Sequence, residues 1–147
     1  MIKIIVVGKL HQTYLKEGIN YYEKQIPFPV KWIEVKDEAL ESGKQKEGER
    51  ILKHISASDQ VILLDVLGKM MSSQSFSKRI DQLMTYQQGA IVFVIGGSYG
   101  VSNDVKARAN DHLSFSKMTF PHQMMRLILI EQIYRAFMIL KHHPYHK

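Results

Sequence analysis

Residues 91–100, IVFVIGGSYG, are the stretch that most constrains the fold of this chain. Five apolar residues run directly into two glycines, followed by a polar pair and a third glycine. A continuous run of β-branched and aromatic residues is typical of a strand buried on both faces, as in a parallel sheet. Glycines at its carboxyl end permit a sharp turn and a close approach by a ligand. Since ligands of open α/β sheets bind at the carboxyl ends of strands, we expect a small-molecule site here.

Strand-like and helix-like segments alternate along the rest of the chain. Apolar runs predict strands at 1–7, 30–36, 60–66 and 113–116. Helical spacing predicts helices at 12–25, at 49–55, from Ser73 or Ser75 to a cap at Gly89, from Ser102 or Asn103 to Asn110, and at 122–141. Residues 37–48 read as a loop or as the fraying start of a helix, and residues 67–69 as a turn. The alternation predicts an α/β fold with a largely parallel sheet, formed as one domain over residues 1–147.

Several classes of protein and site are excluded by composition. The absence of cysteine excludes disulfides, thiolate zinc sites and cysteine nucleophiles. No apolar run approaches the length that spans a bilayer, and the first one is too short for a signal peptide, so we expect a cytoplasmic protein without a membrane partner. Three histidines near the end, His142, His143 and His146, are interrupted by Pro144 and lack a carboxylate cluster. We expect exposed terminal histidines there rather than a metal site.

The net charge of +6 is concentrated in the second half of the chain. Residues 1–73 carry 11 Lys or Arg against 10 Asp or Glu, whereas residues 74–147 carry 9 against 4. Five of the seven histidines also lie in the second half. A basic region of this kind favours a polyanionic partner such as nucleic acid, although a modest positive charge also serves solubility.

The predicted helix 122–141 is apolar almost all the way round. A surface helix needs an apolar stripe of only about 100°, so the wider coverage predicts burial on two sides. One side would face the sheet, and the other would face a second copy of the chain, which predicts a homodimer. The alternative is complete burial of this helix within one chain.

The glycine turn itself matches no nucleotide-binding motif. Its spacing is not GxGxxG, and it lacks the Lys-Ser or Lys-Thr pair of a P-loop. Leu64 and Asp65 also lie at the carboxyl end of a predicted strand, and FSKMTF at 115–120 follows a third one. We therefore expect three loops from one edge of the sheet to converge on one pocket.

Several of these stretches resemble a known family, the RlmH family of SPOUT-class RNA methyltransferases. The resemblance lies in VFVIGGSYG, in LSFSKMTFPHQMMRLILIEQIYRAF, in HHPYHK and in the starts MIKIIVVGK and VILLDVLGK. It covers essentially the whole chain, although the loop at 37–48 is shorter than is usual in the family. The resemblance implies a parallel-sheet SPOUT fold with a C-terminal trefoil knot, a feature that composition does not reveal and that general topology rules disfavour.

The resemblance also implies a reaction and a set of site residues. The reaction is methylation of N3 of a pseudouridine in 23S ribosomal RNA, on assembled ribosomes, by a homodimer that uses S-adenosylmethionine and no metal. The family's donor-binding positions fall on residues of the three loops, which are Leu64, Gly96, Phe115, Ser116, Lys117, Met118, Thr119 and Phe120. Apolar side chains there would wall the adenine, while Gly96 would let the donor approach the backbone.

Residues for the RNA substrate are expected mainly near the C-terminus. Tyr145 and His146 are the candidate catalytic residues, because tyrosine stacks on unpaired bases and an imidazole can serve as a general base. His122, Arg126, Arg135 and Lys147 are the candidate RNA-binding residues. Other roles stay open: both arginines can pair with Glu131 or cross the dimer, and the tail can be disordered.

Two functions of other classes remain as alternatives at this point. One is a non-catalytic ribosome- or RNA-binding factor that uses the basic region and binds no donor. The other is an ordinary nucleotide-binding α/β protein, which would tolerate loss of residues 145–147.

Overall fold

A computed structural model describes residues 1–147 and contains five strands and five α-helices. The elements in chain order are β1 (Ile2–Val7), α1 (Thr13–Glu23), β2 (Val30–Val35), a 3-10 turn η1 (Glu41–Gly43), α2 (Lys44–Leu52), β3 (Gln60–Met70), α3 (Ser73–Tyr86), β4 (Ile91–Ile95), α4 (Asn103–Arg108), β5 (Asp111–Ser114) and α5 (His122–Leu140).

The five strands form one sheet in the order β2-β1-β4-β3-β5, and every neighbouring pair is parallel. The predicted α/β class and parallel sheet are therefore confirmed. Because all strands run the same way, their carboxyl ends meet at one edge of the sheet. The loops that follow β3, β4 and β5 leave from that edge.

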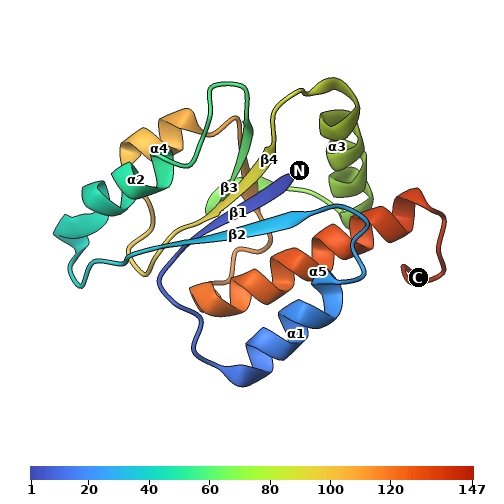
Figure 1. Ribbon diagram of the computed structural model, residues 1–147, viewed down its shortest axis with the longest axis horizontal. Helices are drawn as coiled ribbons and strands as arrows, with labels where there is room; N and C mark the ends of the chain where they lie inside the picture. The colour runs from blue at the N-terminus through green and yellow to red at the C-terminus, as the bar shows by residue number, and fades with distance from the viewer.

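Helices cover both faces of the sheet, with α1, α3 and α5 on one face and α2 and α4 on the other (Figure 1). Alternate residues of β1 belong to the hydrophobic cores on the two faces of the sheet. Ile4 and Val6 pack with α5, whereas Ile5 and Val7 pack with α2 and α4. All five residues of β4 are buried. Each side chain buried in this way contributes roughly 1.5–3 kcal/mol to folding, which explains the continuous apolar runs.

Helix α5 is packed between α1 and α3 beneath the sheet (Figure 1). None of its residues is fully exposed, and its ring of apolar residues is therefore largely explained within one chain. Met124 and Ile128 remain half-buried. No helix of this protein is both long enough and apolar enough to cross a membrane.

Three local predictions need correction. β3 does not end at residue 66 but continues to Met70, with a break in its pairing to β5 between Leu64 and Lys69. A Cβ on Gly68 would lie 2.6 Å from the backbone of His112, so the two chain segments approach too closely for a side chain. The break is therefore an irregularity within β3, and the predicted turn at 67–69 was wrong.

The other two corrections concern the ends of α3, whereas the start of α2 at Lys44 falls within residues 37–48, where a loop or the fraying start of a helix was expected. The cap of α3 is Ser72, whose side chain accepts a hydrogen bond from the Ser75 N–H, rather than Ser73 or Ser75. Gly89 is not a left-handed cap, because α3 ends at Tyr86 and a Cβ on Gly89 would meet the Ser58 carbonyl. Ser102 does cap α4, as the sequence predicted.

Candidate functional site

A cavity of about 650 Å³ lies at the carboxyl edge of the sheet. It is formed by residues 63–66 of β3, the end of β4, the loop 96–101, Lys106 of α4, the segment 113–121 and the first turn of α5. Its volume is in the range of small-molecule and cofactor sites, and half of its lining residues are hydrophobic. The three stretches that the sequence predicted to converge do meet at this cavity, although the first of them, at Leu64 and Asp65, lies within β3 rather than in a loop.

The structure brings most of the predicted donor-binding residues to the cavity wall. The lining includes Leu64, Gly96, Phe115, Ser116, Met118, Thr119 and Phe120. Lys117 lies in the same loop but is not part of the lining. Donor binding by these residues stays a prediction, for which the geometry now supplies a suitable space.

The glycine turn after β4 is compact. The Gly100 N–H donates to the Gly97 carbonyl at 3.0 Å, and Gly100 has a φ of +82°, a region that favours glycine. A Cβ on Gly96 would lie 2.7 Å from Val101 Cγ1. Gly96 is thus required by the packing of the turn itself, in addition to any approach of a ligand.

The segment after β5 is held by its own serines. Ser114 Oγ donates to the Ser116 carbonyl at 2.9 Å, and Ser116 Oγ accepts from the Met118 N–H at 3.0 Å. These bonds fix the path of the loop that carries Phe115 and Phe120. Both phenylalanines also line a second cavity of about 220 Å³, which extends along α5 to Ile128 and Gln132.

His122 lies in the cavity wall at the start of α5. Burial of the ring, reinforced by the guanidinium of Arg126, lowers the pKa of His122 below its usual value. The carboxylates of Asp37 and Glu47 oppose that shift. His122 is therefore a mainly neutral imidazole near pH 7, placed beside the expected donor rather than on an open RNA-binding surface.

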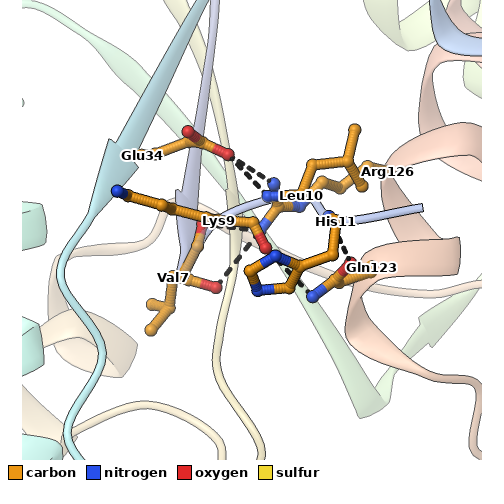
Figure 2. A network of polar contacts seen from close by, with 8 residues as sticks. Val7, Lys9, Leu10, His11, Glu34, Gln123 and Arg126 are labelled. Atoms are coloured by element: carbon orange, nitrogen blue, oxygen red, sulfur yellow. Dashed lines mark hydrogen bonds and ion pairs between the residues drawn. The ribbon is translucent and has the colours of Figure 1, made fainter. Parts of the chain in front are cut away.

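Arg126 is 2% exposed and anchors the start of α5 to the end of β1 (Figure 2). Its Nη1 donates to Glu34 Oε2 at 2.9 Å, and its Nη2 donates to the carbonyls of Val7 and Gly8 at 3.2 and 2.9 Å. Its Nε has no hydrogen-bond partner. With its side chain enclosed in this way, Arg126 is not available to phosphates in this structure.

Neighbouring bonds extend the same network along the β1–α1 loop. Glu34 Oε2 also accepts from the Leu10 N–H at 3.1 Å. Gln123 binds the loop on both sides, since its Oε1 accepts from the His11 N–H and its Nε2 donates to the Lys9 carbonyl (Figure 2). The cavity end of α5 is thus rigidly attached to β1 and β2.

The C-terminal tail folds back along α5 after His142, whose backbone adopts the left-handed conformation with a φ of 56°. The Tyr145 hydroxyl donates to Glu131 Oε1 at 2.9 Å, and Arg135 lies over the Tyr145 ring at 4.8 Å while it also binds Glu131. Burial, together with hydrogen bonds to Tyr22 and Glu131, raises the pKa of the Tyr145 phenol well above its usual value. Tyr145 is therefore protonated and cannot act as a base in this position.

His146 is held between two partners. Its Nδ1 lies 3.0 Å from Arg135 Nη1, and its Nε2 lies 3.0 Å from the side-chain amide of Gln74. Because arginine only donates, Nδ1 must accept, and a neutral ring then carries its proton on Nε2. The Gln74 amide must accordingly present its oxygen to that proton.

Neither candidate catalytic residue lines the cavity of its own chain, and Lys147 is exposed at the end of the tail. Glu131 and Arg135, which hold the tail, lie about 14 and 20 Å from His122 along the helix, at a rise of about 1.5 Å per residue. The single chain therefore brings the predicted donor residues together but leaves the predicted catalytic residues apart from them.

Two charged residues of the cavity wall carried little or no signal in the sequence. Asp65 was noticed only as a strand-end residue, and Lys106 of α4 was missed altogether. An exposed helical lysine resembles any other surface lysine, so no local pattern distinguishes Lys106. No group of three or more His, Asp or Glu side chains is placed to hold a metal ion.

Comparison with known proteins bears on the whole chain. The family described as "Predicted SPOUT methyltransferase" matches residues 1–146. A protein named "Ribosomal RNA large subunit methyltransferase H" from Exiguobacterium sp. (strain ATCC BAA-1283 / AT1b) is 52% identical over 157 residues, covering 99% of each chain. The protein of the same name from Acholeplasma laidlawii (strain PG-8A) is 50% identical over 146 residues, again with 99% of each chain covered.

A solved structure supports the fold alone. It is described as a probable methylase family protein from Haemophilus influenzae Rd KW20 and is similar with a TM-score of 0.56 at 14% sequence identity. The match covers 96% of this chain and 66% of that one. The family match over nearly the full length and the relatives at about half identity agree with the resemblance found in the sequence. This chain belongs to the SPOUT methyltransferase family.

Proposed function

We propose that this protein methylates large-subunit ribosomal RNA with S-adenosylmethionine as donor. The observation that carries the proposal is a single cofactor-sized cavity, built from the three predicted loops, in a chain about 50% identical to proteins named for this activity. The specific reaction we propose is methylation of N3 of a pseudouridine in 23S rRNA. A 147-residue chain has little surface with which to read sequence, so assembled ribosomes are the expected substrate. The protein would then act in the cytoplasm, where ribosomes are found.

The residues of the cavity fit this donor. Leu64, Phe115 and Phe120 offer apolar surface for an adenine, and the hydroxyls of Ser116 and Thr119 and nearby backbone groups offer polar contacts. When bound, S-adenosylmethionine supplies an electrophilic methyl group, and its transfer requires no metal. The protein must then orient the two reactants and accept the N3 proton.

Two histidines are candidates for the general base that accepts this proton. His146 offers Nδ1, once Arg135 releases it, and His122 offers a neutral imidazole in the cavity wall. Tyr145 would instead stack on or hydrogen-bond to the acceptor nucleotide, because its phenol stays protonated. Arg135 would bind a phosphate after exchanging its contact with Glu131.

We propose that the active enzyme is a homodimer in which the tail of the partner supplies the acceptor-side residues next to each donor cavity. The tail does not line the cavity of its own chain, and half-buried apolar residues of α5 remain available for a second copy. Two exposed apolar side chains, Val66 and Met118, line the cavity, and Leu67 and Met70 of β3 are exposed as well. A second copy would remove this surface from water.

A charged residue on the open face of α5 tests the dimer. We expect Ile128→Asp to convert the protein to a monomer in light scattering, while Leu40→Asp, at an exposed leucine in the loop before η1, leaves the mass unchanged. Circular dichroism would verify that both variants fold. A folded I128D variant that keeps the mass of the wild-type dimer would remove this face from the interface, and a monomeric wild-type protein would end the proposal.

We also propose that the C-terminal half is tied in a trefoil knot. In support, the chain crosses from β4 to β5 at the far side of β3 and returns over the carboxyl edge to α5, so that its loops gather round the cavity (Figure 1). Stretching the chain from both ends with optical tweezers tests the knot. A knotted chain stops short of the contour length of an unknotted one.

The activity is tested by a methyl-transfer assay with labelled S-adenosylmethionine. Assembled ribosomes, free large subunits and naked 23S rRNA are offered in parallel, and mass spectrometry locates the modified nucleotide. We expect transfer to a pseudouridine at N3, most rapidly on assembled ribosomes. RNA binding without transfer to any of the three substrates would favour the non-catalytic factor instead.

A further inference from the structure

Only two fully charged side chains line the main cavity, and they are of opposite sign. Asp65 follows the regular part of β3, and Lys106 projects from α4. Neither residue is among the predicted donor-binding residues. Lys106 takes part in none of the ion pairs of the chain, and the two are not paired with each other.

Strand alternation divides the cavity into an apolar and a charged side. Leu64 of β3 and Leu113 of β5 pack with the α5 layer, so their neighbours Asp65 and His112 point toward the opposite face, where α4 lies. Lys106 approaches from that same face. Phe120 and Met125 bound the cavity on the α5 side. The cavity is thus amphipathic across the edge of the sheet.

His112 connects the two charged residues. Its Nε2 lies 3.0 Å from the Lys106 carbonyl, and since a carbonyl only accepts, Nε2 must carry the proton. Its Nδ1 lies 3.6 Å from Asp65 Oδ2, which is longer than a hydrogen bond. The Asp65 Oδ1 atom accepts from the Leu67 N–H at 3.0 Å, which fixes the carboxylate without neutralising it. Asp65 therefore keeps acceptor capacity toward the cavity.

We propose that Asp65 and Lys106 recognise the amino-acid end of the methyl donor, Asp65 binding its ammonium group and Lys106 its carboxylate. This inference rests on the proposed function, because it takes the cavity to be the donor site. The amino-acid end of S-adenosylmethionine is a zwitterion, and its adenine is flat and largely apolar. An amphipathic cavity with one unpaired cation and one anchored anion on the same side matches that ligand. The adenine would occupy the α5 side and the amino-acid end the α4 side.

Titration calorimetry with three ligands that differ only in the amino-acid end separates the roles of Asp65 and Lys106. The probes are S-adenosylhomocysteine, its decarboxylated analogue, which keeps the amine, and methylthioadenosine, which lacks the whole amino-acid end. The variants are Lys106→Met and Asp65→Asn, with Lys78→Met on α3 as a control that removes an exposed lysine far from the cavity.

We expect Lys106→Met to weaken S-adenosylhomocysteine about tenfold, the effect of losing one charge-assisted hydrogen bond, and to leave both other probes unchanged. Asp65→Asn should weaken S-adenosylhomocysteine and its decarboxylated analogue by about the same factor and leave methylthioadenosine unchanged. Lys78→Met should change none of the three affinities. Thermal unfolding without ligand verifies that each variant is folded.

Two outcomes would overturn the inference, and they differ from failure of the proposed function. If Lys106→Met or Asp65→Asn changes no affinity, or weakens methylthioadenosine as much as S-adenosylhomocysteine, the two residues do not read the amino-acid end. If the wild-type protein binds none of the probes, the cavity is not a donor site, and the proposed function fails together with this inference.

Discussion

The two ends of α5 are built in different ways. At its start, Arg126 is 2% exposed and bound to Glu34 and to two backbone carbonyls of the β1 end (Figure 2). At its other end, the tail is held by hydrogen bonds among partly exposed side chains, in which Arg135 joins Glu131, Tyr145 and His146. An enclosed guanidinium with an anion and two carbonyls as partners holds one geometry, whereas the ion pair of the more exposed Arg135 contributes little and exchanges readily.

This difference indicates how the work of the site is divided. In the proposed function, the donor-binding half would lie within one chain and be held in place, because the start of α5 cannot move without breaking its bonds to β1. The acceptor half would be the short tail, whose contacts cost little to exchange for a partner chain or for RNA. A methyltransferase that holds a small donor tightly and meets a large substrate only briefly needs both properties.

The largest expected effect comes from removing the tail. We expect deletion of residues 145–147 to lower the rate of methyl transfer at least about 100-fold, as for loss of a general base and its positioning. Donor affinity should stay within about twofold of wild type, since no tail residue lines the cavity. Calorimetry with S-adenosylmethionine and the ribosome assay measure the two quantities. Full activity of the truncated protein would contradict the division of labour between the two ends.

Stability should respond differently to equivalent changes at the two ends. Glu34→Gln leaves the buried Arg126 without its anion and should lower the free energy of unfolding by about 2 kcal/mol. Glu131→Gln removes the anion of the more exposed Arg135 and should lower it by less than about 1 kcal/mol. Urea unfolding of the two variants beside wild type makes the comparison. Equal losses would mean that the tail is anchored as firmly as the start of α5.

The smallest expected effect is a pH dependence from His122. Its folded pKa lies below the ordinary value of 6.5, so the unfolded chain binds the proton first as pH falls. The contribution of His122 to stability is therefore present above pH 6.5 and is lost as the pH falls through 6.5 toward the folded pKa. Between about pH 7.5 and about pH 5.5, we expect the free energy of unfolding of the His122→Gln variant to fall less steeply than that of wild type.

The matched control is His54→Gln at an exposed histidine outside the cavity, which should leave the pH dependence as in wild type. Arg126 enters the same experiment, because its guanidinium helps to lower the pKa of His122. An Arg126→Met variant should therefore show an increased His122 pKa by NMR. An unchanged His122 pKa in that variant would separate the histidine from the buried network.

Much of the fold is predictable because local sequence patterns specify it. The buried run at 91–95 and the apolar spacing of α5 each specify their element without reference to distant residues. Errors occur where a distant segment decides the outcome. Gly68 is needed because the His112 backbone passes close by, and β3 continues past residue 66 because β5 lies there to pair with it.

The site divides in the same way. Gly96 and the residues 115–120 lie directly after strands, and Leu64 ends the regular part of β3, so a rule about strand ends finds all three stretches. In the sequence, Arg126 is a candidate RNA-binding arginine. The structure shows that it is buried and paired with Glu34, 92 residues away. Lys106 and Asp65 are brought to one wall only by the placement of α4 over the same face as Asp65.

The sequence by itself thus determined the parallel α/β class, the three stretches that converge at the cavity, and the family. Periodicity, turn residues and a long motif are properties of residues close together in the sequence, so they can be recognised without knowledge of the tertiary structure. The tertiary structure decided the strand order, the burial of Arg126, the exclusion of the tail from its own cavity and the charged wall opposite α5. These depend on contacts between segments tens of residues apart, where the chain gains from burial and pairing only after the distant partners have met.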